Sequence, residues 1–228
     1  MLAKRDIRHF EASLIYSPDQ FGVNNFLVNL FTQAAELAWN SPITGVSNHL
    51  KDSIYLNIFP GEHYRLIKAI AQIQKPSLIV EIGTYTGMGS LALMQGQVHG
   101  KVITYDIIPW NHFDTHLHQG DFDQNKIEQK LADLADLNEF EKNIEILNQA
   151  DIIFIDGPKD GKFEYQILPL LSKLEAKENK LLIMDDIRFV NMIDLWISIQ
   201  SPKLDASSMG HWSGTGLVDI SQPLKITT

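Results

Sequence analysis

Cysteine is absent from the 228-residue chain. Disulfide bonds, thiolate metal sites and cysteine nucleophiles are therefore excluded. Long apolar runs are also absent, because no stretch approaches the ~18 apolar residues that a membrane-spanning helix requires. The segment 1–10 carries charged residues and lacks the apolar core of a secretory signal. We therefore expect a soluble, cytoplasmic protein that does not bind a membrane.

Basic residues are few relative to acidic ones. The 19 Lys and Arg residues against 28 Asp and Glu residues give a net charge of −9 and a pI near 5.3. A surface that follows nucleic-acid phosphates needs clustered Lys and Arg, so we expect no nucleic-acid partner. The length and a hydrophobic content of 44% permit one substantial core.

Strand-like and helix-like segments alternate along the chain. Apolar runs that predict strands occupy residues 78–82, 102–106, 127–134, 152–156 and 181–185. Patterns that predict helices occupy residues 26–38, 61–74, 91–94, 140–147, 163–174 and 190–199. The tail, 204–220, is predicted to form two closing strands joined by a turn. This alternation is typical of a Rossmann-like α/β fold, in which a mostly parallel sheet carries helices on both faces.

The N-terminal part differs from the rest of the chain. Its apolar residues at 26–38 fall on one helical stripe, which ends at Asn40-Ser41-Pro42. We expect an N-terminal helical cap or lid over residues 1–60 and one compact catalytic domain over residues 61–228. The apolar helix expected at 24–39 also offers a surface for a homodimer.

Acidic residues stand where four of the predicted strands end: Glu81, Asp106, Asp156 and Asp185. In an open α/β sheet, ligands bind in the crevice outside the carboxyl ends of the strands. Acidic side chains repeated at this edge therefore indicate one shared binding site. Asp106 lies at about the offset, ~20 residues, at which a carboxylate meets both hydroxyls of a ribose. A role as a loop or helix-cap residue is the alternative.

The glycine turn after the first predicted strand, residues 80–90, has its glycines at Gly83, Gly87 and Gly89. A dinucleotide-binding turn reads G-x-G-x-x-G and holds a pyrophosphate at a helix N-terminus. The different spacing, together with the carboxylate of Glu81, favours a ligand with a cationic or amino group. A purely structural turn is the alternative.

The segment 80–90 resembles motif I of class I S-adenosylmethionine (SAM)-dependent methyltransferases. The segments 151–160 and 182–186 resemble the metal-dependent O-methyltransferases of the catechol and caffeoyl-CoA type. The resemblance covers roughly residues 55 to 220 and rests on three short motifs in the expected order. It implies a seven-stranded sheet and a SAM-dependent O-methyltransferase. The expected partner is a small-molecule hydroxyl acceptor, such as a catechol-like phenol, a sugar hydroxyl or a product of secondary metabolism.

The resemblance also implies a SAM site along the carboxyl edge of the sheet. Asp106 is expected to hold the ribose hydroxyls, and Asp133 is expected to close the crevice near the adenine. The residues implied in cofactor binding are Glu81, Gly83, Thr84, Tyr85, Gly87, Ser90, Asp106, Ile107, Asp133 and Asp156.

The same resemblance implies a divalent cation, most simply Mg²⁺, held by the carboxylates of Asp156, Asp185 and Asp186. Asp186 stands where the family usually has Asn, so a role as a cap of the following helix is the alternative. Lys159 is implied as the general base. A metal-bound hydroxyl of the acceptor then attacks the methyl carbon of SAM, which yields a methyl ether and S-adenosylhomocysteine (SAH).

Three other functions stay open at this point. A metal-independent SAM methyltransferase leaves Asp185 and Asp186 structural. An NAD(P)-dependent oxidoreductase is disfavoured by the glycine spacing and by Glu81. A non-catalytic module that keeps a nucleoside pocket needs no Lys159 chemistry.

Several aromatic and histidine residues allow two interpretations. Trp110 either lies against the adenine or is packed. The histidines at 112, 116 and 118 read as a solvated loop rather than metal ligands. His211 and Trp212 either line the acceptor pocket or are packed.

Overall fold

The computed structural model describes residues 22–47, 50, 56, 63–97, 99–160, 162–189, 192–208 and 213–227. A seven-stranded sheet has the order β3-β2-β1-β4-β5-β7-β6, and β7 is the strand that runs antiparallel to its neighbours. The strands are β1 Leu78–Ile82, β2 Lys101–Asp106, β3 Ile127–Leu131, β4 Ile152–Ile155, β5 Leu181–Asp185, β6 Lys203–Asp205 and β7 Thr215–Asp219. The predicted mostly parallel, Rossmann-like sheet is confirmed.

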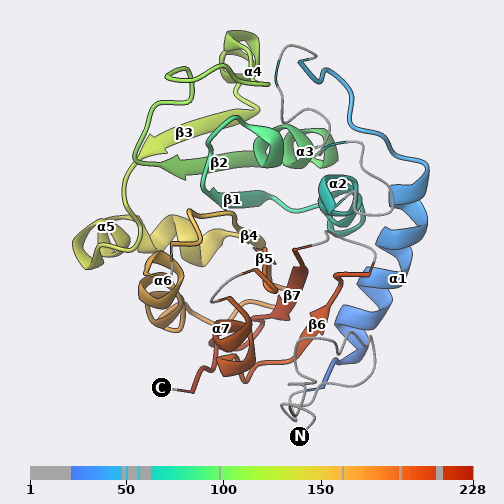
Figure 1. The fold of residues 1–228 in the computed structure, drawn as a ribbon, viewed down its shortest axis with the longest axis vertical. Coiled ribbons are helices and arrows are strands. Elements are labelled where there is room, and N and C mark those ends of the chain that lie inside the picture. The colour runs from blue at the N-terminus through green and yellow to red at the C-terminus, as the bar shows by residue number, and fades with distance from the viewer. Residues whose placement is uncertain are drawn as a thin grey trace, which may run out of the picture.

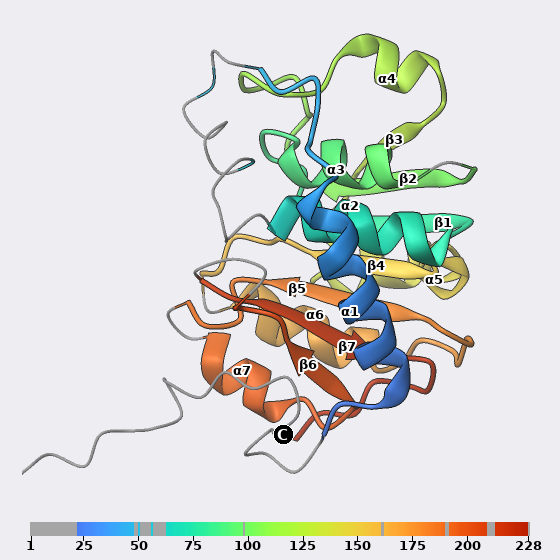
Figure 2. The same cartoon turned by 90° about the vertical axis from the view of Figure 1, so that its right-hand side faces the viewer.

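Helices cover both faces of this sheet (Figure 1). The helices are α1 Asn25–Trp39, α2 His63–Gln74, α3 Met88–Gly96, α4 Gln119–Asp123, α5 Leu137–Gln149, α6 Phe163–Leu171 and α7 Met192–Ser198. One core cluster joins α1, α2 and α3 to the sheet, and a second joins α5, α6 and α7 to the opposite face. Figure 2 shows α1 crossing the first of these faces.

The two clusters follow from central strands whose apolar residues point to both faces of the sheet. Successive side chains of a strand point to opposite faces, so in β4 Phe154 enters the cluster under α1, α2 and α3, whereas Ile153 enters the other. Burial on both faces is typical of parallel strands that carry crossover helices. The strands read as continuous apolar runs for this reason.

Two elements end three residues earlier than predicted, and the other observed ends also differ by up to three residues. The third strand ends at Leu131 instead of 134, because its pairing with β2 stops at Asp106 and the chain then turns at Asp133. Helix α6 ends at Leu171 instead of 174, and its last turn is closed by hydrogen bonds from Ser172 and Lys173. These differences leave the carboxyl edge of the sheet unchanged.

The site position follows from the strand order. Strands β1 and β4 are neighbours, and the chain winds outward from them in opposite directions, toward β3 and toward β5. Such a reversal opens a crevice at the carboxyl ends of the two central strands, where α/β proteins bind ligands. The turns after β1 and β4 therefore form the centre of the candidate site.

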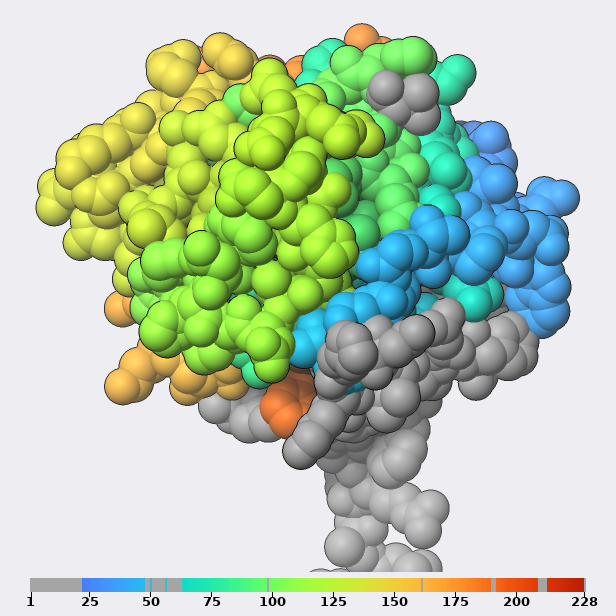
Figure 3. All heavy atoms as spheres, turned by 90° about the horizontal axis from the view of Figure 1, so that it is seen from above, coloured from blue at the N-terminus to red at the C-terminus, as the bar shows by residue number. Residues whose placement is uncertain are grey.

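The N-terminal part contributes α1 and the segment that follows it. The Ser47 amide donates to His116 Nδ1 at 3.1 Å, and the Thr44 amide donates to Gln95 Oε1 at 3.1 Å. Figure 3 shows this blue segment against the green residues between β2 and α4. The predicted cap boundary at residue 60 lies outside the described residues, so the division into cap and catalytic domain stays a prediction. Among the described helices, none has the length and apolar character to cross a membrane.

Candidate functional site

The glycine turn between β1 and α3 packs directly against the turn after β4. Gly83 has φ +108°, and a Cβ atom at this position would overlap the main-chain carbonyl of Asp156. Gly87 has φ +82° and begins α3, and a Cβ atom there would meet Leu117. Both positions combine left-handed backbone with close contact, which only glycine tolerates. The turn is therefore fixed in shape at the centre of the crevice.

Asp106, at the end of β2, holds this turn through the backbone. Its Oδ2 accepts hydrogen bonds from the amides of Thr84 (2.9 Å) and Tyr85 (3.0 Å), and its Oδ1 accepts one from Ile108 (3.0 Å). Tyr85 has φ +40°, and the bond to Asp106 stabilises this rare conformation. A carboxylate has about four acceptor positions. Asp106 thus organises the turn and keeps capacity for a ligand.

Gln129 on β3 is a further organising residue that the sequence analysis missed. Its Oε1 accepts from the Trp110 amide (2.8 Å), and its Nε2 donates to Thr84 Oγ1 (3.1 Å) and to the Ile108 carbonyl (3.0 Å). The only signal in the sequence is a polar residue inside a weak strand pattern. Its partners belong to two separate segments, the turn after β1 and the loop after β2, so its role is visible only in the folded chain.

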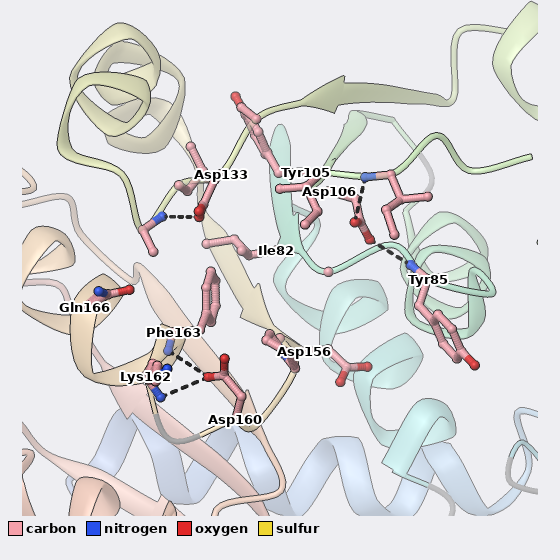
Figure 4. A pocket seen from close by; sticks show the side chains of 18 of the residues that line it. Ile82, Tyr85, Tyr105, Asp106, Asp133, Asp156, Asp160, Lys162, Phe163 and Gln166 are labelled. Atoms are coloured by element: carbon pink, nitrogen blue, oxygen red, sulfur yellow. Dashed lines mark hydrogen bonds between the residues drawn. The ribbon is translucent and has the colours of Figure 1, made fainter. Parts of the chain in front are cut away.

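A cavity of about 660 Å³ lies at the carboxyl ends of β1, β2, β3 and β4. Figure 4 shows its side chains, with Asp106 and Tyr85 on one side and Phe163 and Gln166 on the other. This volume falls in the range of small-molecule and cofactor sites. Of the predicted cofactor residues, those that line the cavity are Gly83, Tyr85, Asp106, Ile107, Asp133 and Asp156.

The remaining predicted cofactor residues lie behind the cavity wall. Glu81 is fully buried, and its carboxyl group accepts a hydrogen bond from Ser90 Oγ. Burial raises the pKa of Glu81 to about 8, although hydrogen bonds from Ser90 and Thr104 oppose the shift. Below that pH, burial favours the neutral form of the group, and a role of Glu81 in cofactor binding stays a prediction. Thr84 and Gly87 shape the turn from behind. Asp133, in contrast, lines the cavity at its exposed rim, where it accepts a hydrogen bond from the Ala135 amide.

Four charged residues meet beside the cavity and form what we call the Lys159 cluster: Lys159, Asp156, Asp185 and Asp186. Lys159 Nζ contacts Asp156 Oδ1, and it lies 3.2 Å from Asp186 Oδ2 and 3.3 Å from Asp185 Oδ2. The Lys159 side chain is only 10% exposed. The predicted convergence of these residues is thus what the fold produces, with the lysine at the centre.

Local backbone geometry directs the lysine inward. Lys159 has φ +51°, and its amide donates to Oε1 of the buried Glu164 at 3.0 Å. Asp160 then caps α6 by accepting from the amides of Lys162 (2.9 Å) and Phe163 (3.0 Å). The loop after β4 is therefore held on both sides of Lys159.

The charges in the cluster change its acid–base properties. Burial alone would lower the pKa of Lys159, but the charges of Asp156, Asp185 and Asp186 outweigh it and raise the pKa. Burial and the neighbouring charge of Asp156 raise the pKa of Asp185. Lys159 therefore stays protonated in this arrangement. Its predicted role as general base would require the loss of a proton that three carboxylates hold in place.

The carboxylates do not fit the predicted divalent cation as they are arranged. In the part of the chain that the structure describes, no group of three His, Cys, Asp or Glu side chains has the arrangement of a metal site. The point on which the three carboxylates converge is held by the Lys159 ammonium. Asp186 faces this ammonium, with its side chain 20% exposed. Metal binding by Asp156, Asp185 and Asp186 stays a prediction.

The aromatic and histidine residues have structural partners. Trp110 stacks on Phe122 with ring centroids 4.5 Å apart, and it does not line the cavity. His116 is fully buried and bonded to Ser47, so it is not solvated as predicted. The His118 amide donates to Asp121 Oδ2 (2.8 Å) at the start of α4. His211 and Trp212 lie outside the described residues.

Comparisons with known proteins agree with this geometry. Residues 80–187 match the family model described as a methyltransferase domain, and this range contains both the glycine turn and the Lys159 cluster. No curated protein matches the chain.

Two solved structures with a TM-score of 0.50 have similar folds. One is the SAH-bound methyltransferase PaMTH1 of Podospora anserina, with 13% identity over 90% of this chain and 89% of that one. The other is a methyltransferase of Geobacter sulfurreducens, with 18% identity over 90% of each chain. The resemblance to class I SAM-dependent methyltransferases is therefore confirmed, and residues 80–187 form a methyltransferase domain in a chain with that fold.

Proposed function

We propose that this chain transfers a methyl group from SAM to a hydroxyl group of a small molecule. The observation that carries the proposal is the cavity at the strand reversal, bounded by a glycine turn that Asp106 holds by two backbone hydrogen bonds. The match of residues 80–187 to a methyltransferase domain supports it independently. The SAH in the Podospora protein is a property of that protein, and it makes SAH the natural probe for this one.

The cavity lining suggests how SAM binds. The remaining acceptor capacity of Asp106 suits the two hydroxyls of a ribose. The rim residue Asp133 suits the amino group of an adenine, and the apolar Phe163 and Ile107 suit its ring faces. The main chain at Gly83 lies close enough to Asp156 to bring the methionine part beside the Lys159 cluster. In this pose the sulfonium faces the acidic half of the site.

The Lys159 cluster then orients the acceptor. Asp156 is the member of the cluster that lines the cavity, and its side chain is 23% exposed. We assign it the hydrogen bond from the acceptor hydroxyl, which aims an oxygen lone pair at the methyl carbon. The S–CH₃ bond breaks as the O–CH₃ bond forms, the sulfonium becomes a thioether, and the hydroxyl proton passes to the carboxylates of the cluster. Most of the acceleration comes from this alignment.

Metal assistance is the part of the sequence-based hypothesis that the contacts of Lys159 disfavour. None of the steps above uses a metal. The metal-independent and metal-assisted alternatives differ in their response to a chelator. Turnover that continues in EDTA supports the first, whereas turnover that stops in EDTA and returns with Mg²⁺ supports the second.

A thermal-shift comparison of SAH with NADP tests the proposed cofactor. A ligand that binds only the folded state stabilises it by RT ln(1 + [L]/Kd), about 2.7 kcal/mol at a hundredfold excess over Kd. We expect SAH to raise the Tm by several degrees and NADP to leave it unchanged. A shift with NADP instead of SAH would support the oxidoreductase alternative, and the absence of any shift with SAH would contradict the proposed function.

A further inference from the structure

We infer that the Lys159 ammonium is the permanent cation of the Lys159 cluster and that the cluster therefore takes up no divalent metal in the native protein. The inference concerns the occupant of the cluster and does not depend on which cofactor fills the neighbouring cavity. It replaces the magnesium site that the three carboxylates predict from sequence.

Lys159 Nζ contacts each of the three carboxylates of the cluster. A lysine ammonium has three N–H donors and no acceptor, and Nζ has one carboxylate partner from the end of β4 and two from the end of β5. Nζ donates hydrogen bonds to Asp156 and Asp185 and forms an ion pair with Asp186. A Mg²⁺ or Ca²⁺ ion needs oxygen ligands at about 2.0 to 2.6 Å. It would have to take the place of the ammonium, because both cations require the same three carboxylates.

Hydrogen bonds of the loop after β4 hold Lys159 in the cluster. Its amide is bonded to the buried Glu164, and the next residue, Asp160, caps α6. Withdrawal of the side chain would leave Asp185, with a side chain only 8% exposed, and Asp156 without their cation. Removing one partner from a buried ion pair is strongly destabilising, because it leaves the other charge buried and unpaired. The fold therefore presents the ammonium to the cluster instead of to solvent.

One oxygen of the cluster has spare capacity. Asp185 Oδ1 is buried and has no hydrogen-bond partner among the described residues, and it lies 3.5 Å from His63 Nδ1. Asp185 as a whole is 6% exposed. With the ammonium removed, this oxygen and the freed carboxylates form a hard donor set that suits a divalent cation. Removal of Lys159 should therefore create a metal site.

Manganese binding to the full-length protein tests this inference. The free Mn²⁺ signal in electron paramagnetic resonance is measured for the wild type, Lys159→Met, Asp185→Asn, the control Lys162→Met and the double variant Lys159→Met/Asp185→Asn. Lys162 is exposed and lies three residues after Lys159, and the described residues show no contact of its side chain with the cluster. Circular dichroism confirms folding, and Lys159→Gln replaces Lys159→Met if the latter does not fold.

We expect no stoichiometric Mn²⁺ binding by the wild type or by Lys162→Met. Lys159→Met should gain one site that binds Mn²⁺ at least about tenfold more tightly than the wild type does. Without the ammonium, no positive charge repels the metal ion from the carboxylates. The double variant should lose that site. A tight single site in the wild type that Asp185→Asn removes would overturn the inference, and so would a folded Lys159 variant that gains no binding. Since no SAH is added, failure here is distinct from failure of the proposed cofactor.

Discussion

The two halves of the carboxyl edge satisfy acidic side chains in different ways. In the half formed by β1 and β2, Asp106 is bonded to three backbone amides, and Glu81 is buried against the hydroxyl of Ser90. In the half formed by β4 and β5, Asp156 and Asp185 meet a single ammonium. The first half contains fixed dipoles around a cavity, whereas the second is an ion cluster.

This difference separates two tasks along one sheet edge. Backbone amides hold a turn in place without adding charge, which leaves room for a ligand beside Asp106. The Lys159 ammonium neutralises only one of the three carboxylates around it. The remaining negative charge suits the sulfonium side of the proposed cofactor. An acidic residue at the end of a strand therefore looks the same in the sequence whether it binds backbone amides, is buried against a hydroxyl or joins an ion cluster. Its partners in the folded chain decide its function.

The largest effect on stability is expected at Gly83, where the two halves of the carboxyl edge touch. Gly83→Ala places a methyl group against the carbonyl of Asp156 at a φ that alanine avoids. We expect a loss of about 5 kcal/mol or failure to fold, since backbone overlap at a strained position exceeds ordinary substitutions. Denaturant unfolding measures it. Gly120→Ala, which has no atom within 4 Å of the new methyl group, is the control and should change stability by less than about 1 kcal/mol.

The second prediction concerns the pH dependence that Glu81 imposes on folding. Its folded pKa of about 8 lies above the ordinary value of 4.5. Between these values the unfolded chain ionises and the folded chain does not, so wild-type stability should fall as the pH rises from about 4.5 to about 8. At about 1.4 kcal/mol per pKa unit the fall has an upper limit of about 5 kcal/mol.

Glu81→Gln removes this titration. The stability of the variant relative to the wild type should increase between pH 5 and pH 8 in denaturant unfolding. The exposed Glu36→Gln serves as the control and should follow the wild type at both values. A constant difference between Glu81→Gln and the wild type across this range would show that Glu81 is ionised in the folded protein.

A third prediction sharpens the contrast within the cofactor half. Asp106→Ala removes the acceptor for three amides and the proposed ribose contact, so the Kd for SAH should rise by about 100-fold, or ~2.8 kcal/mol. Asp133→Ala removes the hydrogen bond from the Ala135 amide and the proposed adenine contact, both at the exposed rim, and should raise the Kd by only about threefold. Isothermal titration calorimetry measures both. Equal effects of the two substitutions would contradict the organising role of Asp106.

The last prediction concerns Gln129, for which we expect a smaller effect than for Asp106. Gln129→Leu removes three hydrogen bonds that hold the loops after β1 and β2, but none of its atoms lines the cavity. We expect SAH affinity to fall by about three- to tenfold, since each net hydrogen bond contributes ~1 kcal/mol and the loops keep their Asp106 bonds. The exposed Gln33→Leu on α1 is the control. An unchanged Kd would limit Gln129 to a packing role.

The sequence predicts the sheet well and the partners of its polar groups poorly. Apolar runs identify β1 and β5 at their observed boundaries, because burial on both faces leaves few polar positions. The same runs show that acids follow the strands, and the fold brings Asp156, Asp185 and Lys159 together as the resemblance implies.

What the sequence does not predict depends on contacts between distant segments. Glu81 was expected to face a ligand, but it alternates to the face under α3, where Ser90 and Gly89 cover it. The inward course of Lys159 depends on a positive φ and on the bond to Glu164, neither of which a motif encodes. The buried contact of His116 with Ser47 joins segments 69 positions apart.

A crystal structure determined with SAH and Mn²⁺, with data collected where manganese scatters anomalously, tests the contrast between the two halves most directly. We predict density for SAH in the cavity between Gly83, Asp106 and Asp133, and no anomalous peak among Asp156, Asp185 and Asp186. A cavity without SAH, or a manganese peak in the position of the Lys159 ammonium, would contradict it.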